Sequence, residues 1–229
     1  MKKLILIFFI TICCSTVYGQ RLGFIGGYQL TNSYAIVGGK NVDFNQTAGS
    51  GFLVGGYFDW NIKKSYGIDV QVLYTMRTSK FNLHYLSDTT TIFRRYMFNF
   101  EIPLHLYVNI PLKKNWILSP YLGPALAIGL HGQDVAWQNV PDWQKPVDSK
   151  KSDLFEKDKG RLNRFELAGQ IGLTVKYKNY GLRAGYSLGL TNLTQKNFDW
   201  TLSLPAAQNK YLFNGVFSVA FIYAFDLKQ

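Results

Sequence analysis

The sequence has almost no cysteine. Its two cysteines, Cys13 and Cys14, lie in the first segment of the 229-residue chain. If that segment is removed on export, the rest of the chain cannot form disulfides, thiol nucleophiles or thiolate metal sites. A lipid-attachment cysteine needs a small residue before it, and Ile12 and Cys13 precede these two. We therefore do not expect a lipoprotein.

The chain also lacks a hydrophobic run long enough for a membrane-spanning helix. The run from Leu4 to about Cys14 has about 11 residues, whereas a spanning helix needs roughly 20. No later segment reaches 18 unbroken apolar residues. If this protein is embedded in a membrane, strands must carry it across.

The first segment has the three parts of a secretory signal peptide. Two lysines open it, the apolar run follows, and Val17 and Gly19 occupy the −3 and −1 positions of a cleavage site. We predict a signal peptide at residues 1–19, cleaved before Gln20, and one domain at residues 20–229.

Acidic residues are scarce compared with basic ones. There are 14 Asp and Glu against 25 Lys and Arg, a formal net charge of +11. An exported protein rarely meets nucleic acid, and no run of Lys and Arg interleaved with aromatics stands out. The charge balance favours an anionic lipid surface as partner and no nucleic acid.

Alternation of apolar and polar residues is abundant. In RFELAGQIGLTVKYK, residues 164–178, the odd positions carry no charge, while the even positions include Arg164, Glu166, Lys176 and Lys178. The segment YLFNGVFSVAFIYAF, residues 211–225, contains no charge and is apolar, aromatic or glycine at every second position. This period of two indicates strands with two different faces.

The alternation predicts eight strands. They span residues 22–30, 51–62, 66–79, 93–110, 116–131, 164–178, 180–192 and 211–225. Tight turns and long polar connections follow one another in regular order, the long ones near residues 31–50, 80–92, 132–163 and 193–210. We predict an all-β fold, an eight-stranded antiparallel up-and-down transmembrane β-barrel with short periplasmic turns and long extracellular loops.

A soluble lipocalin-like barrel with its aromatic face turned inward is the alternative fold. Its other face would meet water and be dense in Lys and Glu, yet that face is largely Gly, Ala, Ser, Thr, Asn and Gln. Aromatic residues recur at the ends of the apolar face, as in the interfacial girdle of a membrane barrel. They are Trp60, Tyr66, Trp116, Tyr177, Tyr180 and Tyr223.

Prolines interrupt two of the predicted strands. Pro103, Pro120 and Pro124 lack the N–H that a strand ladder needs, so we expect bulges or local irregularity there. The segments around them, FEIPLHLYVNI and SPYLGPALAIG, resemble the E-I-P-L strand and the G-P strand of the PorT-like outer-membrane β-barrel family of Gram-negative bacteria. The resemblance extends loosely over the mature chain and implies fold and location. The name-giving member is associated with protein secretion, a role that these motifs do not transfer.

The interior of an eight-stranded barrel is just wide enough for its own side chains. Tyr57, Tyr107 and Tyr121 are predicted to point inward, so we predict a plugged lumen. Buried charges must be paired, and we propose an interior polar network of structural character. Its members are Asp59, Asp69, Glu101, Lys176 and Arg183.

Strand order suggests how these charges pair. Asp59 and Asp69 lie near the periplasmic ends of the second and third strands, and Lys176 and Arg183 lie at the same end half a circumference away. We expect the two pairs to meet across the lumen. The alternative is that water at the periplasmic mouth hydrates all four.

A catalytic constellation is missing from the sequence. No motif joins a serine to His84 in a loop, His105 on an inward face or His131, predicted at the inner face of the outer rim. His105 and Glu101 resemble an acid–base pair, although an interior hydrogen bond explains them better. The histidines do not recur at metal-ligand spacing. We predict no catalytic residue, no cofactor and no metal site.

The predicted function rests on the loops. The longest, Gly132–Asn163, contains Trp137 and Trp143 and suits either an external contact surface or a solvated cover. We predict a non-enzymatic outer-membrane protein with a structural, binding or assembly role. Its expected partners are outer-membrane lipid, lipopolysaccharide, the insertion machinery and an unidentified external ligand or protein. A narrow solute channel is the second possibility and a lipid-modifying enzyme the third.

Overall fold

The structure, a computed structural model, is built from β-strands. It describes residues 20–37, 40–42, 47–84, 90–140, 143–147, 153–155, 162–194 and 210–227. Eight long strands form the wall: β1 (Gln20–Val37), β3 (Thr47–Lys63), β4 (Tyr66–His84), β5 (Thr90–Val108), β7 (Trp116–Val140), β9 (Phe165–Tyr177), β10 (Tyr180–Gly189) and β11 (Lys210–Asp226). Three short strands pair with them: β2 (Lys40–Val42), β6 (Ile110–Pro111) and β8 (Trp143–Val147).

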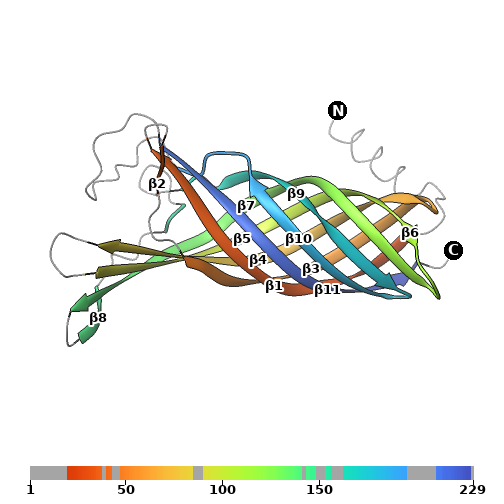
Figure 1. Cartoon of the computed structure of the whole chain (residues 1–229), viewed down its shortest axis with the longest axis horizontal. Helices are drawn as coiled ribbons and strands as arrows, with labels where there is room; N and C mark the ends of the chain where they lie inside the picture. The colour runs from red at the N-terminus through yellow and green to blue at the C-terminus, as the bar shows by residue number, and fades with distance from the viewer. Residues whose placement is uncertain are drawn as a thin grey trace, which may run out of the picture.

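The wall closes on itself. Each long strand pairs antiparallel with its neighbours in the order β1, β3, β4, β5, β7, β9, β10, β11, and β11 returns to β1. The closing ladder runs from Arg21 opposite Asp226 to Val37 opposite Lys210. The strands run obliquely to the long axis of the barrel (Figure 1). The predicted eight-stranded, antiparallel up-and-down arrangement is confirmed.

One end of the barrel, here called the short-turn end, carries three tight connections. Residues 64–65, 112–115 and 178–179 join the strands there. Lys114 and Asn115 both have positive φ, 53° and 70°, the geometry of a type I′ hairpin turn, whose twist matches that of the flanking strands. The start of β1 and the end of β11 lie at the same end, near β6 (Figure 1). The opposite end is called the loop end.

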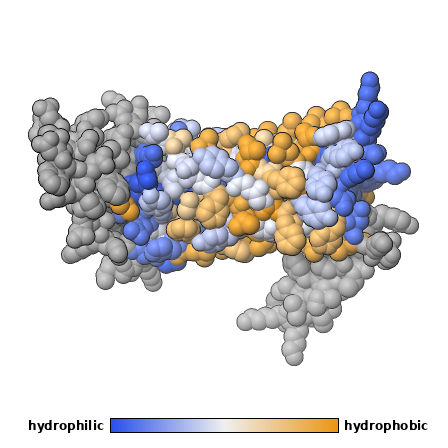
Figure 2. Space-filling view, turned by 90° about the horizontal axis from the view of Figure 1, so that it is seen from below, coloured by the Kyte–Doolittle hydropathy of each residue, from blue (hydrophilic) through white to orange (hydrophobic). Residues whose placement is uncertain are grey.

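Successive residues of each strand point alternately outward and inward. On the outside, Phe24 and Ile171 are 69% and 63% exposed, whereas inward-facing Asp59 and Asp69 are 0% exposed. Across the face in Figure 2, apolar residues form a belt that is bordered by hydrophilic residues at both ends. An apolar outer belt around a polar interior suits hydrocarbon outside and packed side chains inside.

Glycine on the inner face allows the strands to curl tightly. A Cβ on Gly55 would lie 2.0 Å from the carbonyl oxygen of Val72 on the neighbouring strand, while a Cβ on Gly56, which faces the other way, would meet nothing within 4 Å. The same crowding occurs at Gly27, where a Cβ would lie 2.2 Å from the carbonyl oxygen of Val219. A barrel of only eight strands needs such curvature.

Several strands are longer at the loop end than predicted. The predicted loop at residues 31–50 contains the end of β1 and the start of β3, and the one at residues 80–92 contains the end of β4 and the start of β5. β7 continues to Val140 and turns back as β8, which pairs with it from Ala136 opposite Val147 to Val140 opposite Trp143. These strands therefore extend beyond the apolar belt.

The bulges expected at the prolines do not occur, but the expected local irregularity does: between Pro103 opposite Ala125 and Leu106 opposite Leu122, the β5–β7 ladder has no pairs for Leu104 and His105, which face Pro124 and Gly123. The register of β5 with β7 is constant from Asn99 to Tyr107, a stretch that includes Pro103, and the shift lies between Phe98 and Asn99, where β7 has one extra residue, Leu130. The extra residue reverses the faces of β7. His131, predicted to point inward, instead stacks on the ring of Phe98 with centroids 6.5 Å apart and is exposed.

Three predictions fall on residues outside the described ranges. The signal peptide at residues 1–19 lies outside them, as does much of the long connection expected to form a contact surface. The domain boundary before Gln20 therefore stays a prediction. No helix with the length and apolarity needed to cross a membrane occurs in the part of the chain that the structure describes.

Candidate functional site in the barrel interior

The barrel interior holds most of the buried charge of the described residues. Alternation turns these side chains inward, because lipid-facing positions of the same strands are apolar. The buried charged residues are Asp59, Asp69, Arg77, Glu101, Glu166, Lys176 and Arg183. They form three tiers along the barrel axis, with the lower tier nearest the short-turn end.

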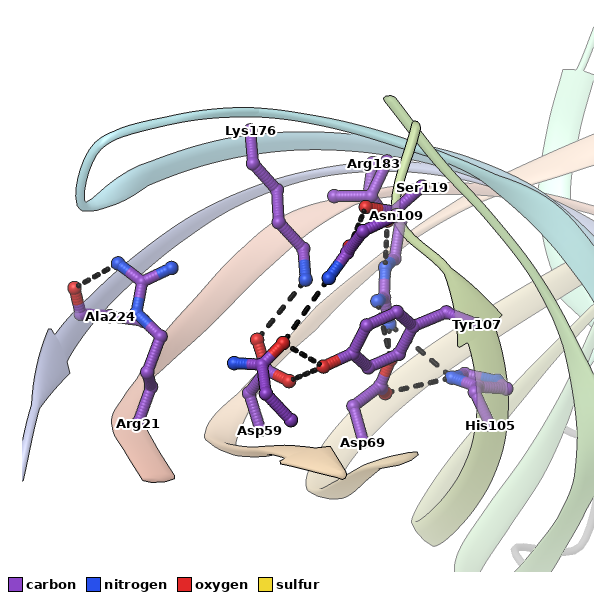
Figure 3. Close-up of polar contacts among 12 residues, drawn as sticks. Arg21, Asp59, Asp69, His105, Tyr107, Asn109, Ser119, Lys176, Arg183 and Ala224 are labelled. Carbon is purple, nitrogen blue, oxygen red and sulfur yellow. Dashed lines mark hydrogen bonds and ion pairs between the residues drawn. The ribbon is translucent and has the colours of Figure 1, made fainter. Parts of the chain in front are cut away.

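The lower tier joins β3 to β9. Lys176 Nζ lies 3.1 Å from Asp59 Oδ2 and 4.1 Å from the centroid of the Tyr107 ring, in a cation–π contact. The Tyr107 hydroxyl donates its proton to the Asp59 carboxylate, and its oxygen lies 2.9 Å from Asn61 Oδ1. Figure 3 shows Lys176 and Tyr107 converging on Asp59 from different strands. The buried carboxylate thus has both a counter-charge and a hydroxyl donor.

Polar contacts continue from this tier to the short-turn end. Ser119 Oγ donates to Asn109 Oδ1 at 2.7 Å, and Asn109 Nδ2 donates to Asn61 Oδ1 at 3.2 Å. Arg21 donates to the carbonyl oxygens of Lys178 and Ala224 at 2.8 and 3.2 Å. These bonds connect four different strands where the barrel ends.

The middle tier joins β4 to β10. Arg183 Nη2 lies 2.7 Å from Asp69 Oδ2 and Nη1 lies 3.2 Å from Asp69 Oδ1, a bidentate pair. Arg183 Nε donates to Thr174 Oγ1 at 2.9 Å. The guanidinium carbon lies 4.4 Å from the ring centroid of Tyr121 and 5.5 Å from that of Tyr57. Arg183 is thus held by charge on one side and by aromatic faces around it.

His105 connects the middle tier to the upper one. Its Nδ1 lies 2.9 Å from Asp69 Oδ1 and its Nε2 lies 2.8 Å from Gln170 Oε1. Gln170 Nε2 in turn donates to Glu101 Oε1 at 2.7 Å. The sequence suggested a resemblance of His105 and Glu101 to an acid–base pair, but the amide of Gln170 lies between them. The two residues are links in one buried hydrogen-bond chain.

The upper tier centres on Arg77 of β4. Its Nη2 lies 2.6 Å from Glu101 Oε2 on the adjacent strand, and its Nη1 lies 2.7 Å from Glu166 Oε2 on β9. All three side chains are almost completely buried. Sequence reasoning placed Glu101 in the interior network but did not include Glu166. The alternation in residues 164–178 carried that signal, because Glu166 shares its face with Lys176.

The lower and middle pairs cross the full width of the lumen. In the ring of strands, β3 and β9 are four steps apart in either direction, and so are β4 and β10. Asp59 and Asp69 therefore lie opposite Lys176 and Arg183, and the side chains meet across the interior at 3.1 and 2.7 Å. Each pair, here called a strut, thus joins opposite walls of the barrel.

Little space remains around these struts. A cavity of about 20 Å³ lies beside Arg77, Glu101, Tyr121 and Gln170, enough for about one water molecule. The inner wall near β1, β3, β4 and β11 is filled by an apolar cluster. Its members are Ile25, Leu53, Tyr57, Leu73, Ala220, Ile222 and Ala224.

A second apolar cluster lies toward the loop end of the barrel. Leu154 and Phe155, from the connection between β8 and β9, pack with Met97 of β5 and Leu212 of β11. A Cβ on Gly129 would lie 2.5 Å from the Phe155 ring, so the ring rests directly on the β7 backbone. Arg164 secures the segment by donating to the Phe155 carbonyl at 3.1 Å. No pattern in the sequence predicts this cluster.

His131 is an exposed histidine outside the buried network, close to one carboxylate. His131 Nδ1 lies 3.8 Å from Asp153 Oδ1, and its side chain is 59% exposed. In the described ranges, no group of three or more His, Cys, Asp or Glu residues is arranged to hold a metal ion. The contacts present in the interior are hydrogen bonds and ion pairs that join its walls.

Solved membrane barrels are similar to the chain. Ail of Yersinia pestis is 14% identical with a TM-score of 0.40, over 90% of this chain and 98% of that one. OprG from Pseudomonas aeruginosa is 12% identical with a TM-score of 0.44, over 90% and 96%. Neisserial surface protein A is 15% identical with a TM-score of 0.39, over 88% and 97%. Likeness at this level implies nothing about function. The comparison with curated proteins found no match.

The family assignment comes from the sequence match. A family model described as "Outer membrane protein beta-barrel domain" matches residues 16–195, a range that contains every long strand except β11. The family description names a β-barrel, and the closed ring of strands with its apolar outer belt agrees with that description. The chain belongs to the outer membrane protein beta-barrel domain family and is an outer-membrane protein.

Proposed function

We propose that the protein is a closed, non-enzymatic barrel that acts as a structural, binding or assembly component through the segments at its loop end. One observation carries this proposal. Ion pairs cross the lumen at the lower and middle tiers, and Arg77 binds two carboxylates above them. A solute would have to separate these buried ion pairs, which is costly.

The proposed orientation follows the usual rule for such barrels. Short turns lie in the periplasm and long connections outside the cell. The apolar belt then contacts outer-membrane lipid, with lipopolysaccharide on the outer side. Arg94 and the exposed Arg164 at the loop end suit its anionic groups. Tyr223 and Phe225 near the end of β11 would serve the insertion machinery as its aromatic signal.

Membership of the narrower PorT-like group belongs to the same proposal. Its supporting residues lie in facing positions of the wall: Glu101 pairs with Ala127 and Pro103 with Ala125 in the β5–β7 ladder. The resemblance supports the fold and the location, and it names no activity or ligand. The structural role of the interior network is likewise proposed, and the variants described in the Discussion test it.

The experiment is planar-bilayer conductance of the protein purified from outer membranes in its heat-modifiable, folded form. A known porin provides the positive control and a heat-unfolded sample the blank. We expect no discrete current steps from the folded barrel. Steady steps that disappear on heating would overturn the closed lumen and make a narrow solute channel the leading function.

A further inference from the structure

Lysines occupy all three connections of the short-turn end. They are Lys63, Lys64, Lys113, Lys114 and Lys178, here called the lysine rim, and all five are exposed. Residues 64–65, 112–115 and 178–179 contain no Asp or Glu. Because these connections follow one another around the barrel, positive charge surrounds this end and is not confined to one side.

Little negative charge faces the rim from within the protein. Of the acids at this end in the described ranges, Asp226 is exposed but paired with Arg21 at 3.0 Å. Asp59 is buried against Lys176. The charge of the lysine rim is therefore available to a partner outside the barrel wall.

Aromatic contacts fix the depth of these lysines. Lys63 Nζ lies 5.7 Å from the ring centroid of Tyr66, and Lys178 Nζ lies 5.6 Å from that of Tyr177. The Tyr177 ring packs against Trp116 with centroids 4.8 Å apart. Tyr and Trp gather at the level of lipid headgroups. The ammonium groups next to them therefore lie at the same level.

Exposed apolar residues adjoin the same lysines. Ile62 near the end of β3 is 43% exposed, and Leu112 in the connection before β7 is 51% exposed. In Figure 2 the hydrophilic fringe at the right-hand end directly borders the apolar belt. Side chains of both kinds at one level suit a surface that offers acyl chains and charged groups together, namely a lipid bilayer boundary.

We propose that the lysine rim binds anionic phospholipid headgroups of the periplasmic leaflet as an annulus around the barrel. The inference rests on the proposed orientation and adds a lipid preference to it. A ring of charge at headgroup depth matches lipid, which surrounds the barrel on all sides, better than a soluble polyanion that would dock from below. Each lysine near an anionic surface strengthens binding by about fivefold.

The test uses the full-length protein reconstituted in phosphatidylcholine bilayers. Electron spin resonance of spin-labelled phosphatidylglycerol and phosphatidylcholine measures how much of each lipid is immobilised on the barrel. We expect the anionic lipid to be preferred by about tenfold or more at low salt. Lys→Gln at all five positions should remove the preference, and Lys→Arg at the same positions should keep it. Equal binding of the two lipids, or a preference that survives Lys→Gln, would overturn the proposal.

Three further measurements separate the outcomes. Binding to isolated peptidoglycan that falls with Lys→Gln, without a lipid preference, would assign the rim to this anionic cell-wall polymer and overturn the proposal. Conductance of the same samples tests the closed lumen independently of the rim. Orientation is read from Ser65→Cys, which should react with an impermeant maleimide in cells only after the outer membrane is permeabilised, and labelling of intact cells would overturn the periplasmic assignment.

Discussion

Lys176 Nζ and Asp59 Oδ2 lie 3.1 Å apart, although their strands stand on opposite sides of the barrel. Residues 117 positions apart in sequence thus meet at the centre of the molecule. The same geometry recurs between Arg183 and Asp69 one tier higher. These contacts make the interior a set of cross-braces whose removal has measurable consequences.

Arg183→Met should destabilise the folded barrel strongly. It leaves Asp69 buried without its bidentate partner, and breaking a buried pair from one side costs about 3–5 kcal/mol. The measurement is the unfolding temperature from the heat-dependent gel shift. The double variant Asp69→Leu, Arg183→Met should be more stable than Arg183→Met, since neither charge of the pair remains. Lys178→Met on the rim is the matched control, and a Tm equal to wild type for Arg183→Met would refute the cross-brace.

Tyr107→Phe should weaken the lower tier by a smaller amount. The hydroxyl serves Asp59 and Asn61, and the loss of a hydrogen bond to a buried charge costs about 1.5–3 kcal/mol. The midpoint of urea unfolding should fall compared with wild type. Tyr180→Phe, at a position that is 51% exposed on the outer face, should leave it almost unchanged. Identical midpoints for the two variants would show that Asp59 does not depend on the hydroxyl.

Gly55→Ala and Gly56→Ala should behave differently despite being neighbours. The new methyl group at Gly55 would lie 2.0 Å from the Val72 carbonyl oxygen, whereas at Gly56 it meets nothing within 4 Å. Overpacking of this kind costs about 1–3 kcal/mol. We expect lower refolding yield and Tm for Gly55→Ala only. Equal tolerance of both would mean that inner-face glycine is not what permits the curvature.

Gly129→Ala and Phe155→Ala should couple strongly. The added Cβ at Gly129 would lie 2.5 Å from the Phe155 ring, so Gly129→Ala is destabilising only while that ring is present. A double-mutant cycle on unfolding free energy should give a coupling of about 1–3 kcal/mol. Additive effects would place the Phe155 ring elsewhere in solution.

The barrel wall could be predicted because lipid imposes a strict rule on it. Every outward position within the belt must be apolar, so Asp59 and Lys176 had to face inward, and their strand positions put them half a circumference apart. The rule ends where the belt ends. In β4, Thr78 and Lys80 end the apolar alternation of the outer face although the strand continues to His84, so the sequence predicted a loop from about residue 80.

The bulge in β7 and the apolar cluster at the loop end could not be predicted from the local sequence pattern. Leu130 is one extra residue among many aliphatic ones, and only its pairing with β5 shows that it shifts the register. Leu154 and Phe155 are isolated apolar residues in a charge-rich stretch. Their partners Met97 and Leu212 lie more than fifty positions away along the chain, beyond the reach of any periodicity.

The two halves of the chain carry opposite charge on their inner surfaces near the short-turn end. Asp59 and Asp69 lie on neighbouring strands of the first half, and Lys176 and Arg183 lie on neighbouring strands of the second. Neither half can neutralise these groups alone, and unpaired charge in a nonpolar setting is costly. The halves are therefore complementary partners within one molecule, whose attraction favours the closed ring over an open sheet with free edges.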